Sequence, residues 1–412
     1  MATISAEHKE FLLKEAHSLL NFARGSVIDT GGFGYLTADG KVDSSKPLEC
    51  YMQARKIQVF GLSHQMGLAD CTELVVHGVQ SLSNLFRDRK NGGFYSAVSA
   101  DGAVVSDRKL AYDHMFVLLG ATTAIELGVQ GAQELFDEAQ AIIEKYFWEP
   151  EFSMMRNDWS QDFSSLDSYR GINPNMHAVE ALTAAFEATG QSVFRDRAYA
   201  IAQRALDGLA RDCEWMLPEH FDVKWNVLAN FNRDNPADPF RPYGITIGHL
   251  FEWSRLALQI DLTMPKEQQG RTWVLESARA IYEIGKRYGW AADGSPGFVY
   301  TIDWEKKPVV TSRMQWVAAE ALMAAFTLWK ITGEDQYLDD YYTWWQYIQD
   351  HVIDKKFGSW HHELNAAQEV TTMTWSGKPD VYHAFNACIM PLLPFQASFI
   401  GSTKKLGVSA LS

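Results

Sequence analysis

The chain has 412 residues and a formal net charge of −14, which excludes a protein that binds nucleic acid by neutralising phosphates. Its hydrophobic content of 47% is enough for a large core and excludes a disordered chain. No apolar run reaches the roughly 18–20 residues that cross a bilayer, and the N-terminal pattern is typical of an amphipathic helix without a cleavage site. We therefore expect a cytoplasmic protein with no membrane partner, and the sequence leaves its oligomeric state open.

A short aromatic segment, often with glycine, recurs along the chain after each pair of helical stretches. The six copies are GGFGYL near Phe33, GGFYSAV near Phe94, FSMM near Ser153, WMLPEHFD near Met216, GFVYTID near Phe298 and GSWHHEL near Ser359. Each interval is long enough for two helices and a short β-like segment, and EALTAAFEATG (Glu180 to Gly190) resembles EALMAAFTLWKITG (Glu320 to Gly333). The repeat therefore predicts six helical hairpins.

Two arrangements of six hairpins are open, an extended solenoid and a closed ring. A solenoid carries polar capping repeats at its ends, but the last helical stretch, Val381 to Leu393, is strongly apolar. We predict an all-α fold, an (α/α)6 barrel or toroid, with short β-like segments in its connecting loops. Without a linker in the sequence, residues 1–412 are expected to form a single domain, with residues from about 400 to 412 as a tail.

The inner helices of this ring are expected to start near residues 48, 110, 174, 245, 313 and 380. An unusual polar or aromatic residue stands near each start. These residues are Arg55, His114, His177, His249, Trp316 and His383. Each alone could be a core residue, but in a closed ring all six are expected to converge on one mouth of the barrel.

His249 shares a helical face with Glu252 and Arg255, which follow it at spacings of three and six residues. A carboxylate one turn from an imidazole can fix its tautomer and raise its basicity. Because Leu250, Phe251 and Trp253 make this helix too apolar for a surface ion pair, we expect Glu252 to orient His249.

His177 and His383 each stand near the expected start of a helix, where the helix dipole disfavours a protonated imidazole. Neutral imidazoles that face one cavity suit proton transfer near pH 7, because the best base has a pKa near the working pH.

The sequence contains no motif for a metal or a nucleotide cofactor. The adjacent His361 and His362 point to different faces, and no HExxH, GxGxxG or GxxxxGK[ST] pattern is present. We expect a reaction without metal or cofactor.

Four segments, RGINPNMHAVEAL, PEHFD, NPADPFRPYGITIGHLFEWSRL and GKPDVYH, together resemble the N-acylglucosamine 2-epimerase superfamily, and within it the aldose–ketose isomerase branch. The resemblance runs from about residue 20 to about residue 395 and implies an (α/α)6 barrel. It implies that His249 and His383 are paired acid and base, that His177 is a third active-site histidine, and that Glu252 is the acid beside the first. The sugar-binding candidates are Arg55, Asn173, Arg241 and Trp316, to which we add Tyr112 and His114 at the start of the second inner helix.

The implied activity is the interconversion of mannose and fructose, in which a histidine moves a proton between C2 and C1 through a cis-enediol. Within the branch, the sulfoquinovose isomerases resemble GKQDIYH, whereas this chain has Pro379 in place of glutamine. Because proline offers no side-chain donor for a sulfonate, an unsubstituted hexose is the expected substrate.

Three alternatives remain open. A 2-epimerase acting on N-acetylglucosamine or cellobiose would use the same histidines but return the proton to the opposite face of C2. An inverting glycoside hydrolase would need two carboxylates about 6.5–9.5 Å apart, whereas histidines occupy the repeat positions here. A helical-repeat binding protein would catalyse no hydrogen exchange, since a fold alone fixes no function.

Overall fold

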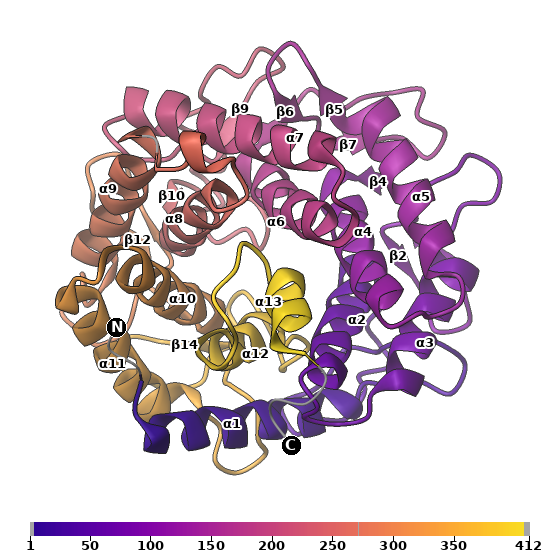
Figure 1. The fold of residues 1–412 in the computed structure, drawn as a ribbon, viewed down its shortest axis with the longest axis horizontal. Coiled ribbons are helices and arrows are strands. Elements are labelled where there is room, and N and C mark those ends of the chain that lie inside the picture. The colour runs from indigo at the N-terminus through magenta and orange to yellow at the C-terminus, as the bar shows by residue number, and fades with distance from the viewer. Residues whose placement is uncertain (1–3, 271, 408–412) are drawn as a thin grey trace.

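The computed structural model describes residues 4–270 and 272–407, and these residues are mostly helical. Among them, six helices line the inside of a ring (Figure 1). They are α2 (Cys50–Gln65), α4 (Ala111–Glu126), α6 (Ile172–Thr189), α8 (Ile247–Asp261), α10 (Gln315–Thr332) and α12 (Tyr382–Ile389). Each contacts the next and α12 contacts α2, which closes the ring. All six begin within two residues of their predicted starts.

A second set of helices surrounds this ring. Its members are α1 (Ala6–Arg24), α3 (Thr72–Ser81), α5 (Ala132–Ile142), α7 (Ser192–Gln203), α9 (Thr272–Gly289) and α11 (Asp335–Tyr347). The last five each pack on the inner helix that precedes them in the chain, and α1 packs on α12, so the N-terminal helix completes the pair at the C-terminal end. Four outer helices run on into π-helical turns, at Leu82–Phe86, Ile143–Phe147, Arg204–Ala210 and Ile348–Val352, and short 3₁₀ turns occur at Lys266–Gln268 and Met390–Leu392.

The inner helices are buried on all sides, as their apolar composition predicts. In α8 all fifteen residues are buried, so the polar members His249, Glu252 and Arg255 lie in the interior with the apolar ones. A helix that is apolar all round belongs in the core of a large protein or in a membrane. No helix in the two described ranges is both long and apolar enough to cross a membrane.

Short antiparallel strands lie at the starts of five of the six inner helices and in the connecting loops of the described residues. They form β1 (Leu48–Glu49) with β2 (Ala97–Val98) and β3 (Val104–Ser106), β4 (Lys109–Leu110) with β7 (Asp158–Trp159), β5 (Trp148–Glu149) with β6 (Met154–Met155), β8 (Arg170–Gly171) with β9 (His220–Phe221), β10 (Ile245–Thr246) with β11 (Thr301–Ile302) and β12 (Pro308–Val310), and β13 (Arg313–Met314) with β14 (Glu363–Leu364). The strands β1, β4, β8, β10 and β13 lead directly into inner helices. Each pairs with a strand from the next repeat, for example Gly171 with His220, which ties neighbouring hairpins together at this end of the ring.

The recurring aromatic segments lie where the chain turns back after an outer helix. Each contains a residue in the left-handed region, including Gly93 (φ 70°), Ser153 (φ 53°) and Gly297 (φ 93°). Glycine adopts this conformation without steric cost, which explains its frequent presence in the repeat.

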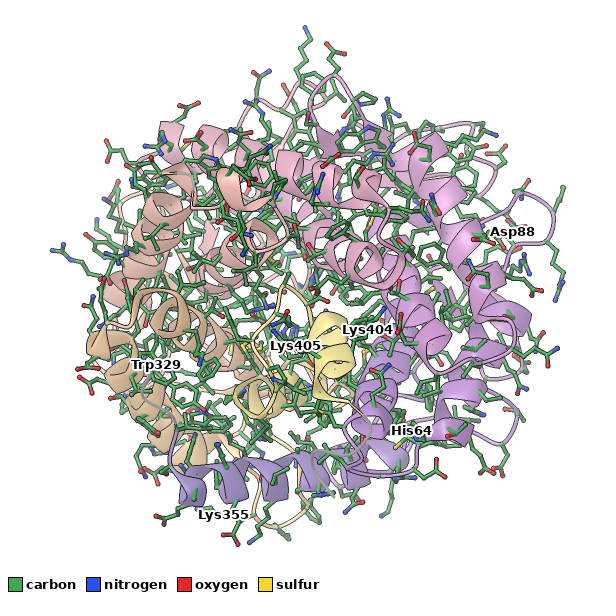
Figure 2. The ribbon with its side chains drawn as sticks, in the orientation of Figure 1. His64, Asp88, Trp329, Lys355, Lys404 and Lys405 are labelled. Atoms are coloured by element: carbon green, nitrogen blue, oxygen red, sulfur yellow. The ribbon has the colours of Figure 1, made fainter. Side chains whose placement is uncertain are left out.

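The prediction of a tail from about residue 400 is wrong for the part that the structure describes, which ends at residue 407. Phe399–Leu406 form α13, which packs on α2 and α6 near the middle of the ring in the view of Figure 1. The Ser398 hydroxyl caps this helix by accepting from the Gly401 N–H, and Phe399 and Ile400 are buried against the ring. On the exposed side of α13, the Lys404 ammonium, labelled in Figure 2, donates to Glu126 at the end of α4. Residues 408–412 lie outside the described residues.

Candidate active site

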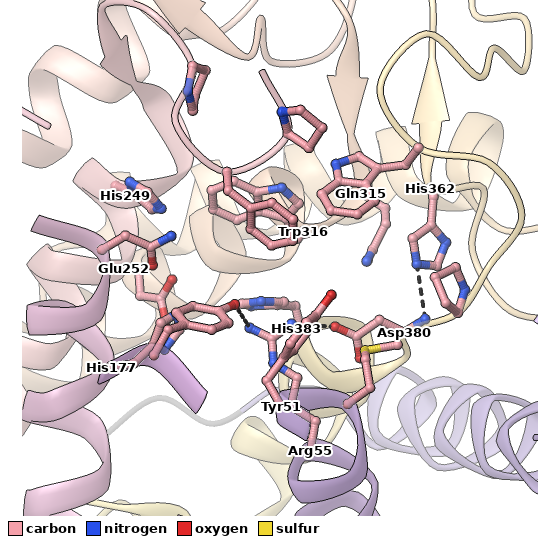
Figure 3. A pocket seen from close by; sticks show the side chains of 18 of the residues that line it. Tyr51, Arg55, His177, His249, Glu252, Gln315, Trp316, His362, Asp380 and His383 are labelled. Carbon is pink, nitrogen blue, oxygen red and sulfur yellow. Dashed lines mark hydrogen bonds and ion pairs between the residues drawn. The ribbon is translucent and has the colours of Figure 1, made fainter. Parts of the chain in front are cut away.

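A pocket opens at the end of the ring where the inner helices begin (Figure 3). All six inner helices or the segments leading into them contribute to it. The lining residues are Tyr51, Met52, Arg55, Tyr112, Asn173, His177, Pro239, Phe240, Pro242, His249, Glu252, Tyr300, Gln315, Trp316, His362, Trp375, Pro379, Asp380 and His383. The structure therefore brings together most of the residues that the repeat singled out.

His249 is held by a carboxylate, but not by the one predicted. Its Nδ1 lies 2.9 Å from both carboxylate oxygens of Glu219, which directly precedes β9. Glu219 also accepts from the backbone N–H of Thr246, the residue before α8. It therefore fixes both the start of α8 and the orientation of the His249 imidazole. The prediction that Glu252 orients His249 is wrong, because Glu252 lies one turn further into the barrel, 3.8 Å from His177 Nδ1. With Nδ1–H donated to Glu219, Nε2 is the nitrogen left for a ligand.

His383, on α12, has the same arrangement and also lies beside Trp316. Its Nδ1 lies 2.8 Å from Oε1 of Glu320 on α10. The centroid of the Trp316 ring lies 5.4 Å from the His249 ring and 5.7 Å from the His383 ring. A Cβ at Gly248 would come within 2.2 Å of the Trp316 ring, so glycine at this position leaves room for the indole beside the two histidines. The two imidazoles thus flank one aromatic surface.

His177 is the third imidazole held by an acid. Its Nδ1 lies 3.1 Å from Oε2 of Glu180, one turn further along α6. Burial lowers the pKa of His177 to about 4, so the ring is neutral at pH 7. The neutral state agrees with the sequence-based expectation, but burial, rather than a position at the first turn of the helix, is the cause.

Beneath the histidines, three carboxyl groups surround one guanidinium. The Arg255 Nε donates to Glu320 at 3.1 Å, and Arg255 Nη2 lies 3.5 Å from Glu252. Arg255 is therefore a buried charge-balancing residue. The side chains of Glu180, Glu252 and Glu320 belong to three adjacent inner helices, α6, α8 and α10.

Two groups of side chains here could hold a metal ion. One consists of His177, Glu180 and Glu252, and the other of Glu252, Glu320 and His383, with ligand atoms within 4.8 Å of one another. Sequence spacing could not reveal them, because their members come from different helices. In each group a histidine is already bonded to a carboxylate, and Arg255 lies beside two of the acids. A bound cation would have to compete with these contacts.

The opposite wall of the pocket carries Arg55. Its Nη1 lies 2.5 Å from Asp380 and its Nη2 donates to the Tyr112 hydroxyl at 2.8 Å. The guanidinium also lies over the rings of Phe116 and Tyr382, 4.3 and 4.8 Å from their centroids. Burial opposes the charge, but the tyrosine hydroxyls and Asp380 keep the pKa of Arg55 above its ordinary value. Arg55 is a fixed positive charge.

The predicted sugar-binding residues divide into two groups. Asn173, Tyr112 and Trp316 line the pocket, and the Asn173 Oδ1 has no hydrogen-bond partner within the described residues. His114 and Arg241 do not line it.

His114 and Arg241 are instead engaged elsewhere in the fold. The two nitrogens of His114 bond the Leu110 carbonyl and the Phe94 N–H, because residues two apart on a helix point to different faces and Tyr112 takes the inward one. The Arg241 guanidinium is 2.7 Å from Asp158, while the preceding Phe240 turns into the mouth.

Sequence reasoning missed the acids that hold the histidines, although their motifs were visible. Glu180 and Glu320 are the first residues of the two similar segments EALTAAF and EALMAAF. Glu219 is the glutamate of PEHFD. A repeated acid in an otherwise apolar helix was the available signal, because a buried carboxylate needs a partner.

A ring of paired helices around a pocket with three carboxylate-held imidazoles has the groups needed for acid–base chemistry. The sequence profile of the N-acylglucosamine 2-epimerase (GlcNAc 2-epimerase) family matches residues 31–387, and the chain belongs to this family. This confirms the resemblance carried by the motifs.

Individual relatives match over nearly the whole chain. A D-mannose isomerase from Thermobifida fusca is 41% identical over 406 residues, which cover 98% of this chain and 99% of the relative. A D-mannose isomerase from Pseudomonas cannabina pv. alisalensis is 39% identical over 96% of this chain and 95% of its own length. Among solved structures, a D-mannose isomerase superposes with a TM-score of 0.87 at 26% identity, covering 95% of this chain and 99% of the other.

Proposed function

We propose that this protein is an aldose–ketose isomerase that interconverts D-mannose and D-fructose. The observation that carries the proposal is the pair His249 and His383, each fixed through Nδ1 by a buried acid and both facing Trp316 in one pocket. Relatives named D-mannose isomerase, similar over 95% or more of this chain, support the choice of sugar.

The proposed reaction moves one proton between neighbouring carbons of the open-chain sugar. A histidine Nε2 removes the proton from C2, the C2–H electron pair forms the C1–C2 double bond, and the carbonyl oxygen O1 gains a proton. The resulting cis-enediol loses the proton on O2 as the C2 carbonyl forms, and the first histidine returns its proton to C1. One of His249 and His383 serves the carbons, and the other serves the oxygens.

The remaining pocket residues are proposed to bind the sugar, and Arg55 to stabilise the charge that develops on its oxygens. Arg55 offers a permanent positive charge, and neutral His177, whose Nδ1–H is bonded to Glu180, offers Nε2 as an acceptor for a sugar hydroxyl. An oriented donor such as Arg55 typically contributes about 2.7–4 kcal/mol to the transition state. Asn173, Tyr112 and Trp316 complete the sugar-binding surface.

We further propose that the ring is an (α/α)6 toroid forming one cytoplasmic domain, and that the reaction needs no metal. The successive contacts of the inner helices and the closure between α12 and α2 support the toroid. Exhaustive chelation is expected to leave activity unchanged. Loss of activity on chelation, with recovery on adding a divalent cation, would show instead that one of the two groups around Glu252 holds a functional metal.

The direct test is proton NMR of mannose incubated with the protein in deuterated water. We expect fructose to form, with deuterium entering at the exchanging carbon. Glucose as the product would identify a 2-epimerase, and neither product nor exchange would identify a binding protein.

A further inference from the structure

Glu252 occupies an unusual position at the base of the pocket. Its side chain is 1% exposed, and neither carboxyl oxygen has a hydrogen-bond partner among the described residues. It nevertheless lines the pocket, and Figure 3 shows it between His249 and His177 in that view. An ionised carboxylate in such surroundings would lack the hydrogen bonds that offset its desolvation.

The titratable and charged groups around Glu252 come from all six inner helices. They are Arg55 on α2, Tyr112 on α4, His177 and Glu180 on α6, His249 and Arg255 on α8, Glu320 on α10, and Tyr382 and His383 on α12. Only Arg255 and Arg55 carry positive charge in this set when the histidines are neutral. Arg55 is already paired with Asp380, which leaves Arg255 for three carboxyl groups.

Hydrogen-bond donors are divided unequally among the three acids. Glu180 accepts from His177 at 3.1 Å and from the Tyr382 hydroxyl at 2.5 Å. Glu320 accepts from His383 at 2.8 Å and from Arg255 at 3.1 Å. Within the described residues Glu252 has two longer ion-pair contacts and no hydrogen bond: its Oε1 lies 3.5 Å from Arg255 Nη2 and 3.8 Å from His177 Nδ1. The donors therefore stabilise negative charge on Glu180 and Glu320, whereas Glu252 receives none of them.

We propose that Glu252 is a neutral carboxylic acid at pH 7 and donates a hydrogen bond to an oxygen of the bound sugar. In this role it keeps its proton throughout the reaction and stabilises the enediol as charge develops on that oxygen. A buried carboxylic acid that acts as a donor in this way is known from ketosteroid isomerase, where an aspartic acid in an apolar site serves the same purpose. The donor role rests on the proposed isomerase function, whereas the protonation state does not.

The electrostatics of the cluster agree with the assignment. Burial, together with the negative charges of Glu320 and Glu180, raises the pKa of Glu252 well above its ordinary value. By contrast, Arg255 and His383 outweigh burial at Glu320 and lower its pKa. The two acids occupy equivalent places near the starts of adjacent helices, so the donors around them account for the difference.

The first test measures the proton directly in the ligand-free enzyme. An infrared difference spectrum of wild type minus Glu252→Gln at pH 7 should contain the carbonyl stretch of a protonated carboxylic acid, shifted in deuterated water. The matched variant Glu320→Gln should leave this band in place. Absence of the band in the wild type, or its survival in Glu252→Gln, would overturn the proposal whatever sugar the enzyme uses.

A second readout is the pH dependence of stability. A carboxyl group whose pKa is higher in the folded than in the unfolded protein lowers the stability as pH rises above the unfolded value. The thermal midpoint of the wild type should therefore fall more steeply with rising pH than that of Glu252→Gln. An identical slope in the two proteins would contradict a native-state proton on Glu252.

Kinetics then test the donor role. Glu252→Gln keeps an N–H donor of similar shape, and its kcat should fall by less than about tenfold. Glu252→Met has similar length but no donor, and its kcat should fall by about 10²–10³-fold with a smaller change in KM. Equal losses in both variants, with normal circular dichroism, would overturn the donor role while leaving the infrared result to decide the protonation state.

Discussion

Two walls of the pocket carry side chains with different chemical roles. The histidine wall (His177, His249 and His383) holds three imidazoles, each bonded through Nδ1 to a buried carboxylate. The arginine wall (Arg55 with Tyr112 and Asp380) holds a guanidinium among aromatic rings. A proton carrier needs a free lone pair and a fixed tautomer, whereas a charge-stabilising group must stay charged at every working pH. Carboxylates fix the tautomers of the imidazoles on the first wall, whereas Asp380 and the tyrosine hydroxyls favour the charge of Arg55 on the second.

The largest expected effect is on the histidine wall itself. His249→Ala and His383→Ala should each lower kcat by 100-fold or more, since general acid–base catalysis contributes roughly 10²–10⁴-fold. Steady-state kinetics with mannose and circular dichroism would check this. Near-normal turnover in either folded variant would remove that histidine from the proposed mechanism.

The acids behind the histidines should have the next largest effect. Glu219→Gln and Glu320→Gln remove the negative charge that holds each Nδ1–H, and we expect activity to fall by about 10–100-fold, as for other partners of functional histidines. Profiles of kcat/KM against pH should shift as well. The control is Glu276→Gln, whose acid pairs with Arg211 on the surface and should not matter. A fully active Glu219→Gln enzyme would show that the His249 tautomer does not depend on this contact.

A smaller effect is expected on the arginine wall. Arg55→Lys retains the charge but cannot reach Asp380 and Tyr112 with two nitrogens at once. Loss of one hydrogen bond to a charged group predicts about a tenfold or greater decrease in kcat/KM. Arg195→Lys, at a surface pair with Asp196, provides the matched control. If Arg55→Lys were as active as the wild type, the geometry of this wall would not contribute to catalysis.

The smallest effect concerns specificity beside the arginine wall, where Pro379 lines the pocket. The wild type should prefer mannose to sulfoquinovose, and Pro379→Gln should narrow that preference by less than about tenfold, below the roughly 1.5–3 kcal/mol that a fully formed hydrogen bond to a charged group contributes. Values of kcat/KM for mannose, glucose, lyxose and sulfoquinovose in both proteins would measure it. Wild-type turnover of sulfoquinovose equal to that of mannose would place the enzyme with the sulfoquinovose isomerases instead.

The starts of the inner helices could be predicted because the repeat is local. Apolar residues at helical spacing, separated by aromatic turn segments, define where each helix begins, and all six begin within two residues of the expected position. The pocket histidines follow from the same repeat, since a ring brings equivalent positions together. The α13 helix was missed because Lys404 and Lys405 give the segment a polar character, and only its contacts with the ring show that Phe399 and Ile400 are buried.

The partners of the histidines could not be predicted from spacing. His249 and Glu252 share a helical face, but the bond to His249 comes from Glu219, thirty residues earlier. Likewise His383 is bonded to Glu320, sixty-three residues away and on another helix. The sequence also could not show which of Tyr112 and His114 faces the pocket. The two residues are only two positions apart on α4 and point to different faces, and it is Tyr112 that lines the pocket.

The sequence alone determined the helical repeat, the family and the identity of the three carboxylate-held histidines, His177, His249 and His383, because these are properties of local pattern and of motif. Only the tertiary structure decided which carboxylate holds which imidazole and which acid is left without a donor. The reason is physical: the charge state of a buried group depends on the few polar atoms within about 4–6 Å of it. In a closed ring those atoms come from helices far apart in the chain.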